Sequence, residues 1–172
     1  MRRIIFLDSG PLGVACGTSD KEVLRNLRAW LVNEATDGSA VVIPEITDYE
    51  IRRELLAAGL TASLARLDEL HDFPGVYLPI TTESIRLAAD LWAGARRGGW
   101  STADEKSIDA DAILAAQVLN YRSDADDWWV ATDNERHLSR HLGDRARPWQ
   151  KIPSSREVRE ILETQQRLNP PT

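Results

Sequence analysis

Two acidic residues follow directly on short apolar segments of the sequence. Asp8 comes after the run IIFL at 4–7, and Asp133 comes two residues after the run WWVA at 128–131. If both runs are parallel strands, their carboxyl ends meet at the edge where open α/β sheets bind ligands. The sequence therefore predicts two carboxylates near each other at one edge of a sheet.

Further acids lie near the first turns of predicted helices. Glu50 lies early in a helix that begins near residue 46, and Asp109 and Asp111 open an apolar helix over 108–121. Asp109 is also suited to cap that helix by accepting backbone N–H bonds. Asp111 leads into an almost wholly apolar helix, where a carboxylate without a partner is unfavourable. These acids join Asp8 and Asp133 as candidates for one site.

A cluster of carboxylates has a definite chemistry. Two carboxylates about 4 Å apart repel each other by roughly 4 kcal/mol at an effective dielectric of 20, so a cluster favours a bridging cation. Hard oxygen ligands favour Mg²⁺ or Mn²⁺, and the single Cys16 excludes a multi-cysteine metal site or an internal disulfide. Such ions polarise phosphoryl groups and activate water. Metal-dependent hydrolysis of a phosphodiester follows as the expected reaction.

The elements that must position these acids alternate between short apolar runs and amphipathic helices. This pattern predicts an α/β fold whose central parallel sheet has four to five strands, with helices on both faces. The expected strands are 4–7, 41–43, 76–78 and 128–131, with a possible fifth near 149–152. The expected helices are 21–35, 46–58, 61–71, 81–96, 108–121, 135–141 and 156–167, and a polar loop is expected at 100–107.

Composition limits the class of protein. The 172 residues are 42% hydrophobic and 28% charged, which is typical of one globular domain. No apolar run approaches the roughly 20 residues of a membrane span, and the N-terminal apolar run is too short for a signal peptide. We therefore expect a cytoplasmic protein without a membrane partner. The net charge of −6 does not exclude RNA, because arginines and acids can occupy separate surfaces.

Four segments together resemble the PIN-domain family, in particular its VapC-type ribonuclease toxins of toxin–antitoxin pairs. They are IIFLDSGPL at 4–12, IPEITDYEIRR at 43–53, IDADAILAA at 108–116 and VATDN at 130–134. Their order fits that family over roughly residues 4–152. The resemblance implies a PIN-like domain over 1–152, followed by a C-terminal helix and tail over 153–172.

The resemblance also implies roles for individual residues. Asp8, Glu50 and Asp111 would bind Mg²⁺ or Mn²⁺ and orient the attacking water, and Asp109 would be an additional metal ligand. The family places its fourth polar residue two positions after the threonine, which is Asn134 here with Asp133 beside it. Either residue could complete the site, and one or two metals could be held.

Substrate and partners follow from the same resemblance. Thr132 and Asn134 would contact the phosphate or its water, and Arg52 and Arg53 would contact the flanking RNA backbone. The implied partners are an RNA substrate, a small antitoxin protein and a second copy of the chain in a homodimer.

Other readings of the sequence remain open. A haloacid-dehalogenase phosphatase would need a second Asp at position 10, which is Gly, and the Gly-x-x-x-x-Gly-Lys run of a P-loop NTPase does not occur. The main alternative is a PIN-like module that binds RNA or protein without cleaving it. Cleavage of DNA in place of RNA is a further possibility.

Overall fold

The computed structural model describes residues 2–73, 75–99, 105–122 and 125–168. Within these ranges the chain has a five-stranded parallel sheet and eight α-helices. The strands are β1 (Arg3–Leu7), β2 (Ala40–Pro44), β3 (Tyr77–Leu78), β4 (Asp127–Ala131) and β5 (Ala146–Arg147). The helices are α1 (Ser9–Cys16), α2 (Glu22–Thr36), α3 (Glu45–Ala57), α4 (Thr61–His71), α5 (Thr82–Arg97), α6 (Glu105–Tyr121), α7 (Glu135–Leu142) and α8 (Ser155–Leu168).

The order of the strands creates a crevice at the centre of the sheet. The order is β3-β2-β1-β4-β5, and every pairing is parallel. The chain runs outward from β1 to β3 and then crosses to β4 on the other side of β1. Connections on either side of this point therefore leave in opposite directions, which opens a ligand crevice beyond the carboxyl ends of β1 and β4.

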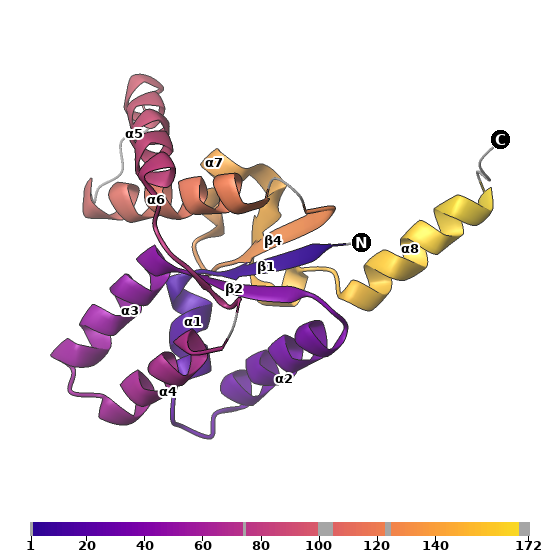
Figure 1. The fold of residues 1–172 in the computed structure, drawn as a ribbon, viewed down its shortest axis with the longest axis horizontal. Helices are drawn as coiled ribbons and strands as arrows, with labels where there is room; N and C mark the ends of the chain where they lie inside the picture. Colours follow the sequence, from indigo (N-terminus) through magenta and orange to yellow (C-terminus); the bar gives the residue numbers. More distant parts are fainter. Residues whose placement is uncertain (1, 74, 100–104, 123–124, 169–172) are drawn as a thin grey trace.

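Both faces of the sheet carry a hydrophobic core. Alternate side chains of β1 point to opposite faces. Ile4 and Phe6 pack with residues of α6 and α7, whereas Ile5 and Leu7 pack with residues of α1 and α4. Figure 1 shows these helices in two layers, with α1–α4 on one side and α5–α7 on the other. Cys16 is fully buried in the second core. The predicted α/β class, the parallel sheet and the helices on both faces are confirmed.

Two helix starts differ from the sequence prediction. Helix α1 was not expected, because Gly10 and Pro11 were interpreted as breakers. Pro11 is the third helical residue, in the first turn, where a missing N–H costs no intrahelical hydrogen bond. Helix α6 begins at Glu105, so Asp109 lies inside it and does not cap it. Of the loop expected at 100–107, residues 100–104 lie outside the described residues.

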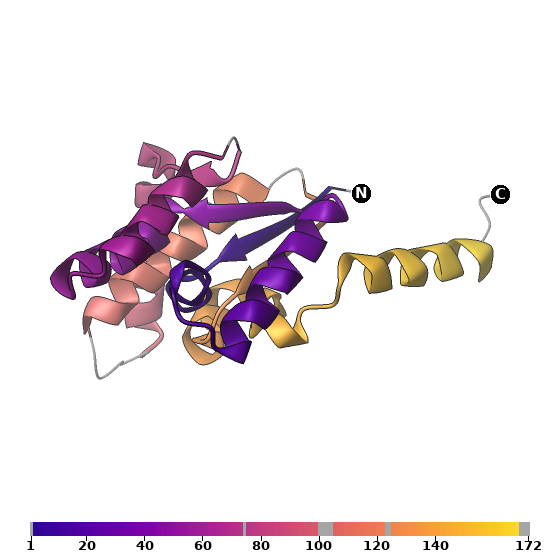
Figure 2. The same ribbon diagram turned by 90° about the horizontal axis from the view of Figure 1, so that it is seen from below.

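The fifth strand also differs in position. It is Ala146–Arg147, which pairs with the end of β4, whereas residues 149–151 form a 3-10 turn. After this turn, α8 leaves the body of the domain and extends away from it, as Figures 1 and 2 show. Among the helices described here, none is long and apolar enough to cross a membrane.

Candidate functional site

Asp8 lies at the centre of the crevice. Its predecessor Leu7 pairs with Ala131 across the β1–β4 ladder, so Asp8 and Thr132 follow the paired residues side by side. The Thr132 hydroxyl donates to Asp8 Oδ2 over 2.6 Å, and the Ser9 backbone N–H donates to Asp8 Oδ1 over 2.7 Å. The second bond makes Asp8 the N-cap of α1. Asp8 is therefore a buried carboxylate fixed through both of its oxygens.

Asp133 approaches Asp8 from the end of β4. Burial raises the pKa of Asp8 despite the hydrogen bonds from Thr132 and Ser9, and the negative charge of Asp133 raises it further. A Cβ added to Gly10 would lie 2.6 Å from Asp133 Oδ2, closer than real side chains come. Glycine at position 10 thus provides the space in which this carboxylate lies beside the start of α1.

Glu50 brings a third carboxylate toward the same crevice from α3. Burial raises the pKa of Glu50, and the next largest cause is the negative charge of Asp8. The guanidinium of Arg53 lies 4.0 Å from Glu50 Oε1 and acts in the opposite direction. The electrostatic effect of Asp8 on Glu50 indicates that the charges of α3 and β1 meet in this crevice.

Asp111 is linked to Asp8 through a chain of polar groups. The side-chain amide of Asn134 donates to Asp111 Oδ1 over 3.3 Å, and the Asn134 backbone N–H donates to the Thr132 hydroxyl over 2.8 Å. That hydroxyl in turn donates to Asp8. Nδ1 of His137 lies 3.6 Å from Asp111 Oδ2, within ion-pair distance, although it makes no hydrogen bond. Residues from β1, β4, α6 and α7 thus form one connected site.

Three residues that were predicted for the site, Asp109, Arg52 and Arg53, differ in their exposure and in the partners that they contact. Asp109 is exposed, because two residues along a helix correspond to about 200° of rotation away from Asp111. The guanidinium of Arg52 forms ion pairs with Asp48 at 2.9 Å and Asp68 at 2.6 Å. Arg53 stays half exposed above the Tyr49 ring and beside Glu50, which makes it the better placed arginine for a ligand.

The donor chemistry of the site suits Mg²⁺ or Mn²⁺, but the side chains do not form a finished cage. Carboxylate oxygens are the ligands these ions prefer, and burial, with a smaller effect of a neighbouring carboxylate, raises the pKa of Asp8 and of Glu50, an effect that a bound cation would oppose. Among the described residues, no group of three or more His, Cys, Asp or Glu side chains is arranged to hold a metal ion. Binding would therefore draw the carboxylates together, and it stays a prediction.

Sequence reasoning missed two contributors to this site. The α1 N-terminus donates to Asp8, and an Asp three residues before a Pro is a helix-start signal that could have revealed it. The second contributor is His137, whose Nδ1 lies within ion-pair distance of Asp111. It lies four residues after Asp133, one helical turn into the segment that follows β4, and that spacing could have indicated a position near the crevice.

The fold is shared with chains of two solved complexes. One is from the structure of VapBC2 from Rickettsia felis bound to a DNA fragment of its promoter, with a TM-score of 0.61, 11% identity, and coverage of 85% of this chain and 98% of that chain. The other is from FitAcB of Neisseria gonorrhoeae, with a TM-score of 0.59, 18% identity, and coverage of 86% and 99%. The likeness is one of fold. No family model and no curated protein matches the sequence.

These comparisons correct the resemblance drawn from the sequence. The assignment to the PIN-domain family as a VapC-type toxin is wrong: no family model matches, and the two solved structures, VapBC2 bound to promoter DNA and FitAcB, do not single out such a toxin. The physical reason for the error is that the four motifs are short and occur in many parallel α/β sheets. An apolar run followed by an acid and a helix is what any parallel strand with a polar carboxyl end presents, so four such segments establish the layout and not the family.

Proposed function

We propose that this chain is a metal-dependent ribonuclease that acts as the toxic component of a toxin–antitoxin pair. The observation that carries the proposal is the buried Asp8 at the carboxyl end of β1, with the charge of Asp133 acting on Asp8 and the charge of Asp8 acting on Glu50. Clustered carboxylates at a ligand-binding edge support chemistry on a phosphate ester through a cation.

In this proposal Asp8, Glu50 and Asp111 would hold Mg²⁺ or Mn²⁺, and Asp133 would add negative charge beside them. The ion would polarise the phosphoryl oxygens and favour hydroxide over water at the phosphorus. Asp109 would act at most as an outer ligand, because it is exposed on α6.

The remaining polar groups would position the carboxylates and the substrate. Thr132 holds Asp8 in one orientation, and Asn134 holds Asp111, so the two acids from distant segments keep a fixed relation. Glu50 would orient the attacking water as a carboxylate acceptor. Arg53 would contact the RNA backbone beside the crevice, since its guanidinium is half exposed and lies next to Glu50.

The partner part of the proposal rests on the fold. Two of the solved structures that share it are toxin–antitoxin complexes, and one of these is bound to promoter DNA. We propose by analogy that a small antitoxin protein binds this chain and covers the crevice. A basic side chain from such a partner would suit a site with excess negative charge.

The test is cleavage of RNA by the purified chain with Mg²⁺, Mn²⁺ or EDTA. Asp8→Asn and Asp111→Asn should abolish metal-dependent cleavage, whereas Asp109→Asn, a matched change two residues from Asp111 on the exposed side of α6, should retain most of it. Parallel reactions on single-stranded DNA separate the two nucleic acids. Cleavage that persists in both site variants, or without metal, contradicts the proposed site.

A second function is favoured by one observation. Since no three metal-ligating side chains among the described residues are arranged to hold an ion, the crevice could instead bind RNA or protein without cutting it. Binding of labelled RNA that is unaffected by EDTA, with no cleavage of any RNA offered, would support this binding module over the ribonuclease.

A further inference from the structure

The C-terminal helix α8 carries a partly exposed apolar stripe. Val158 and Ile161 are three residues apart on one face of the helix, among polar and charged residues. The Ile161 side chain is 54% exposed. Figures 1 and 2 show α8 extending beyond the rest of the fold from the side where β1 begins. An amphipathic helix of this kind requires a partner surface to bury its stripe.

The base of α8 is held firmly by buried polar contacts. Ser155 is buried, and its hydroxyl and backbone N–H donate to the two carboxylate oxygens of Glu34 over 2.5 and 3.2 Å. Arg3 donates to the carbonyl of Pro153 and also contacts Glu34 over 3.2 Å. Farther along, Arg159 pairs with Asp37 at 3.2 Å. These contacts fix the direction in which α8 leaves the body, so it cannot fold back over its own domain without breaking them.

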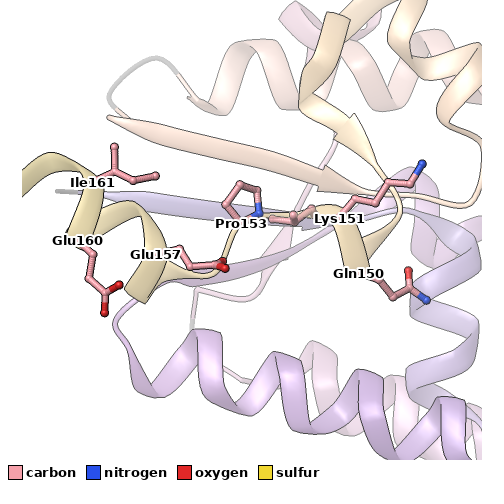
Figure 3. A pocket seen from close by; sticks show the side chains of 7 residues that line it. Gln150, Lys151, Pro153, Glu157, Glu160 and Ile161 are labelled. Carbon is pink, nitrogen blue, oxygen red and sulfur yellow. The ribbon is translucent and has the colours of Figure 1, made fainter.

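The notch beneath α8 does not supply the missing partner. Figure 3 shows Glu157, Glu160 and Ile161 on the helix side and Gln150 and Lys151 on the body side. The walls mix polar and apolar residues, and Ile161 stays more than half exposed despite lining the notch. The apolar stripe is therefore directed to something outside this chain.

The same chain carries an apolar groove between α2 and α4. It has a volume of about 590 Å³ and is lined in part by Leu31, Val32, Leu70, Phe73 and Val76. Val32 and Phe73 are 62% and 61% exposed, so the groove is open along α2 and at the end of α4.

The charged residues of the groove match those of the helix. Arg28 and Arg66 lie along the groove with one acid, Glu69. On α8, Glu157 lies one helical turn before Ile161 and borders the apolar stripe. Apolar surface in the middle with opposite charges at the margin is the usual composition of a specific contact.

We propose that α8 of one copy docks into the α2–α4 groove of a second copy, and that the second copy returns the same contact. This inference is independent of the proposed activity. A helix of 14 residues is about 21 Å long and hides roughly 400 Å² when half of its surface is covered.

The surface area that would be buried favours two reciprocal contacts over a single helix contact. One helix contact buries roughly 800 Å² in total, the size of a packing contact, whereas two reciprocal contacts bury roughly 1,600 Å², the size of a stable interface. Pairing of α8 with α8 would make only one contact and leave both grooves open. Reciprocal docking covers the helix and the groove of each copy.

The first experiment measures the oligomeric state of the full chain by sedimentation velocity over a range of concentrations. Ile161→Glu on the helix and Val32→Glu in the groove should each weaken association by roughly 100-fold or more, because each places a carboxylate in the apolar contact twice per dimer. Val23→Glu is the matched control: Val23 is also an exposed valine of α2, nine residues earlier and on the opposite side of the helix, and this variant should stay dimeric.

A mixing experiment tests the occupant directly. Ile161→Cys and Val32→Cys chains, mixed under a mild oxidant, should form a disulfide between the two different chains, and Cys16 does not compete because it is fully buried. A wild-type chain that stays monomeric at 100-fold above micromolar concentration overturns the proposal. So does a dimer that Ile161→Glu dissociates and Val32→Glu leaves intact, which would indicate α8–α8 pairing.

Discussion

Replacing Thr132 by valine tests whether the crevice holds an ionised Asp8 in place. Thr132 is fully buried, and its hydroxyl donates to Asp8 Oδ2 while accepting from the backbone N–H of Asn134. Valine has nearly the same shape, so Thr132→Val removes these two hydrogen bonds with little change in packing volume.

The magnitude follows from the chemistry of the two bonds. A hydrogen bond to a charged group contributes about 1.5–3 kcal/mol, and a neutral bond to the partly exposed Asn134 N–H contributes up to about 1 kcal/mol. Thr132→Val should therefore lower the free energy of unfolding by about 2–4 kcal/mol at pH 7. Thr132→Ser keeps both bonds and loses one buried methyl group, which costs about 1 kcal/mol.

The pH dependence gives the prediction its sign. The Thr132 bond lowers the pKa of Asp8, so Thr132→Val raises it further above the ordinary value. The stability difference is full above the pKa of Asp8 in Thr132→Val, which is the higher of the two, and it shrinks as the pH falls from that value toward the wild-type pKa. The difference between wild type and Thr132→Val should therefore shrink as the pH falls through the Asp8 pKa, and the acid limb of any cleavage activity should move to higher pH.

Urea unfolding followed by circular dichroism at pH 7 and in acid measures both effects. The expected order of stability at pH 7 is wild type, then Thr132→Ser, then Thr132→Val. If packing alone held this position, valine would equal wild type and serine would be the weaker variant. That reversed order, or a loss that does not change with pH, refutes a hydrogen-bonded carboxylate at the centre of the crevice.

Three further predictions concern the same surroundings. Asp8→Asn should raise the free energy of unfolding at pH 7, because it removes a buried charge with a raised pKa; thermal melting should show this gain shrinking as the pH falls and wild-type Asp8 gains its proton. Gly10→Ala should push Asp133 aside and weaken Mg²⁺ binding in a calorimetric titration, with no more than about 1 kcal/mol change in stability if Asp133 can move. Gln117→Leu leaves the backbone N–H of α3 and the carbonyl of β3 without the buried amide that joins them, and should cost about 2–3 kcal/mol in urea unfolding.

The part of the site that the sequence could predict depends on strand order. The carboxyl ends of parallel strands lie at the same edge of a sheet. If β1 and β4 are neighbours, the acid that follows β1 and the acid that follows β4 must therefore lie close together. The ladder pairs Leu7 with Ala131, and this register places Asp8 beside Thr132. The register itself could not be derived from single residues, because the apolar run on each strand allows more than one alignment.

The parts that could not be predicted depend on contacts between distant segments. Asp111 belongs to the site through the Asn134 amide, and Asp109 does not, yet both precede the same apolar run. Only the rotation of α6 separates them, and Gln117 holds α6 to α3 and β3 by hydrogen bonds from a fully buried side chain. The helix start at Glu105 and the strand Ala146–Arg147 were misplaced because polar residues at helix starts and two-residue strands carry little periodic signal.

Buried carboxylates have different partners at the two ends of the sheet. At the amino end of the strands, Asp127 is contacted by the guanidinium of Arg3 and, at 2.7 Å, by that of Arg145, and Glu34 lies 3.2 Å from Arg3. Each buried acid there has an arginine of this chain beside it, as burial of a charge requires.

At the carboxyl end, Asp8 is held by neutral donors, and the nearby acids increase its negative surroundings. At this edge, where open α/β sheets bind ligands, no arginine of the described residues is among the groups that act most strongly on the buried Asp8 carboxylate. Because a cation from outside the chain is the simplest group that would neutralise it, adding Mg²⁺ should stabilise the wild-type chain more than Asp8→Asn.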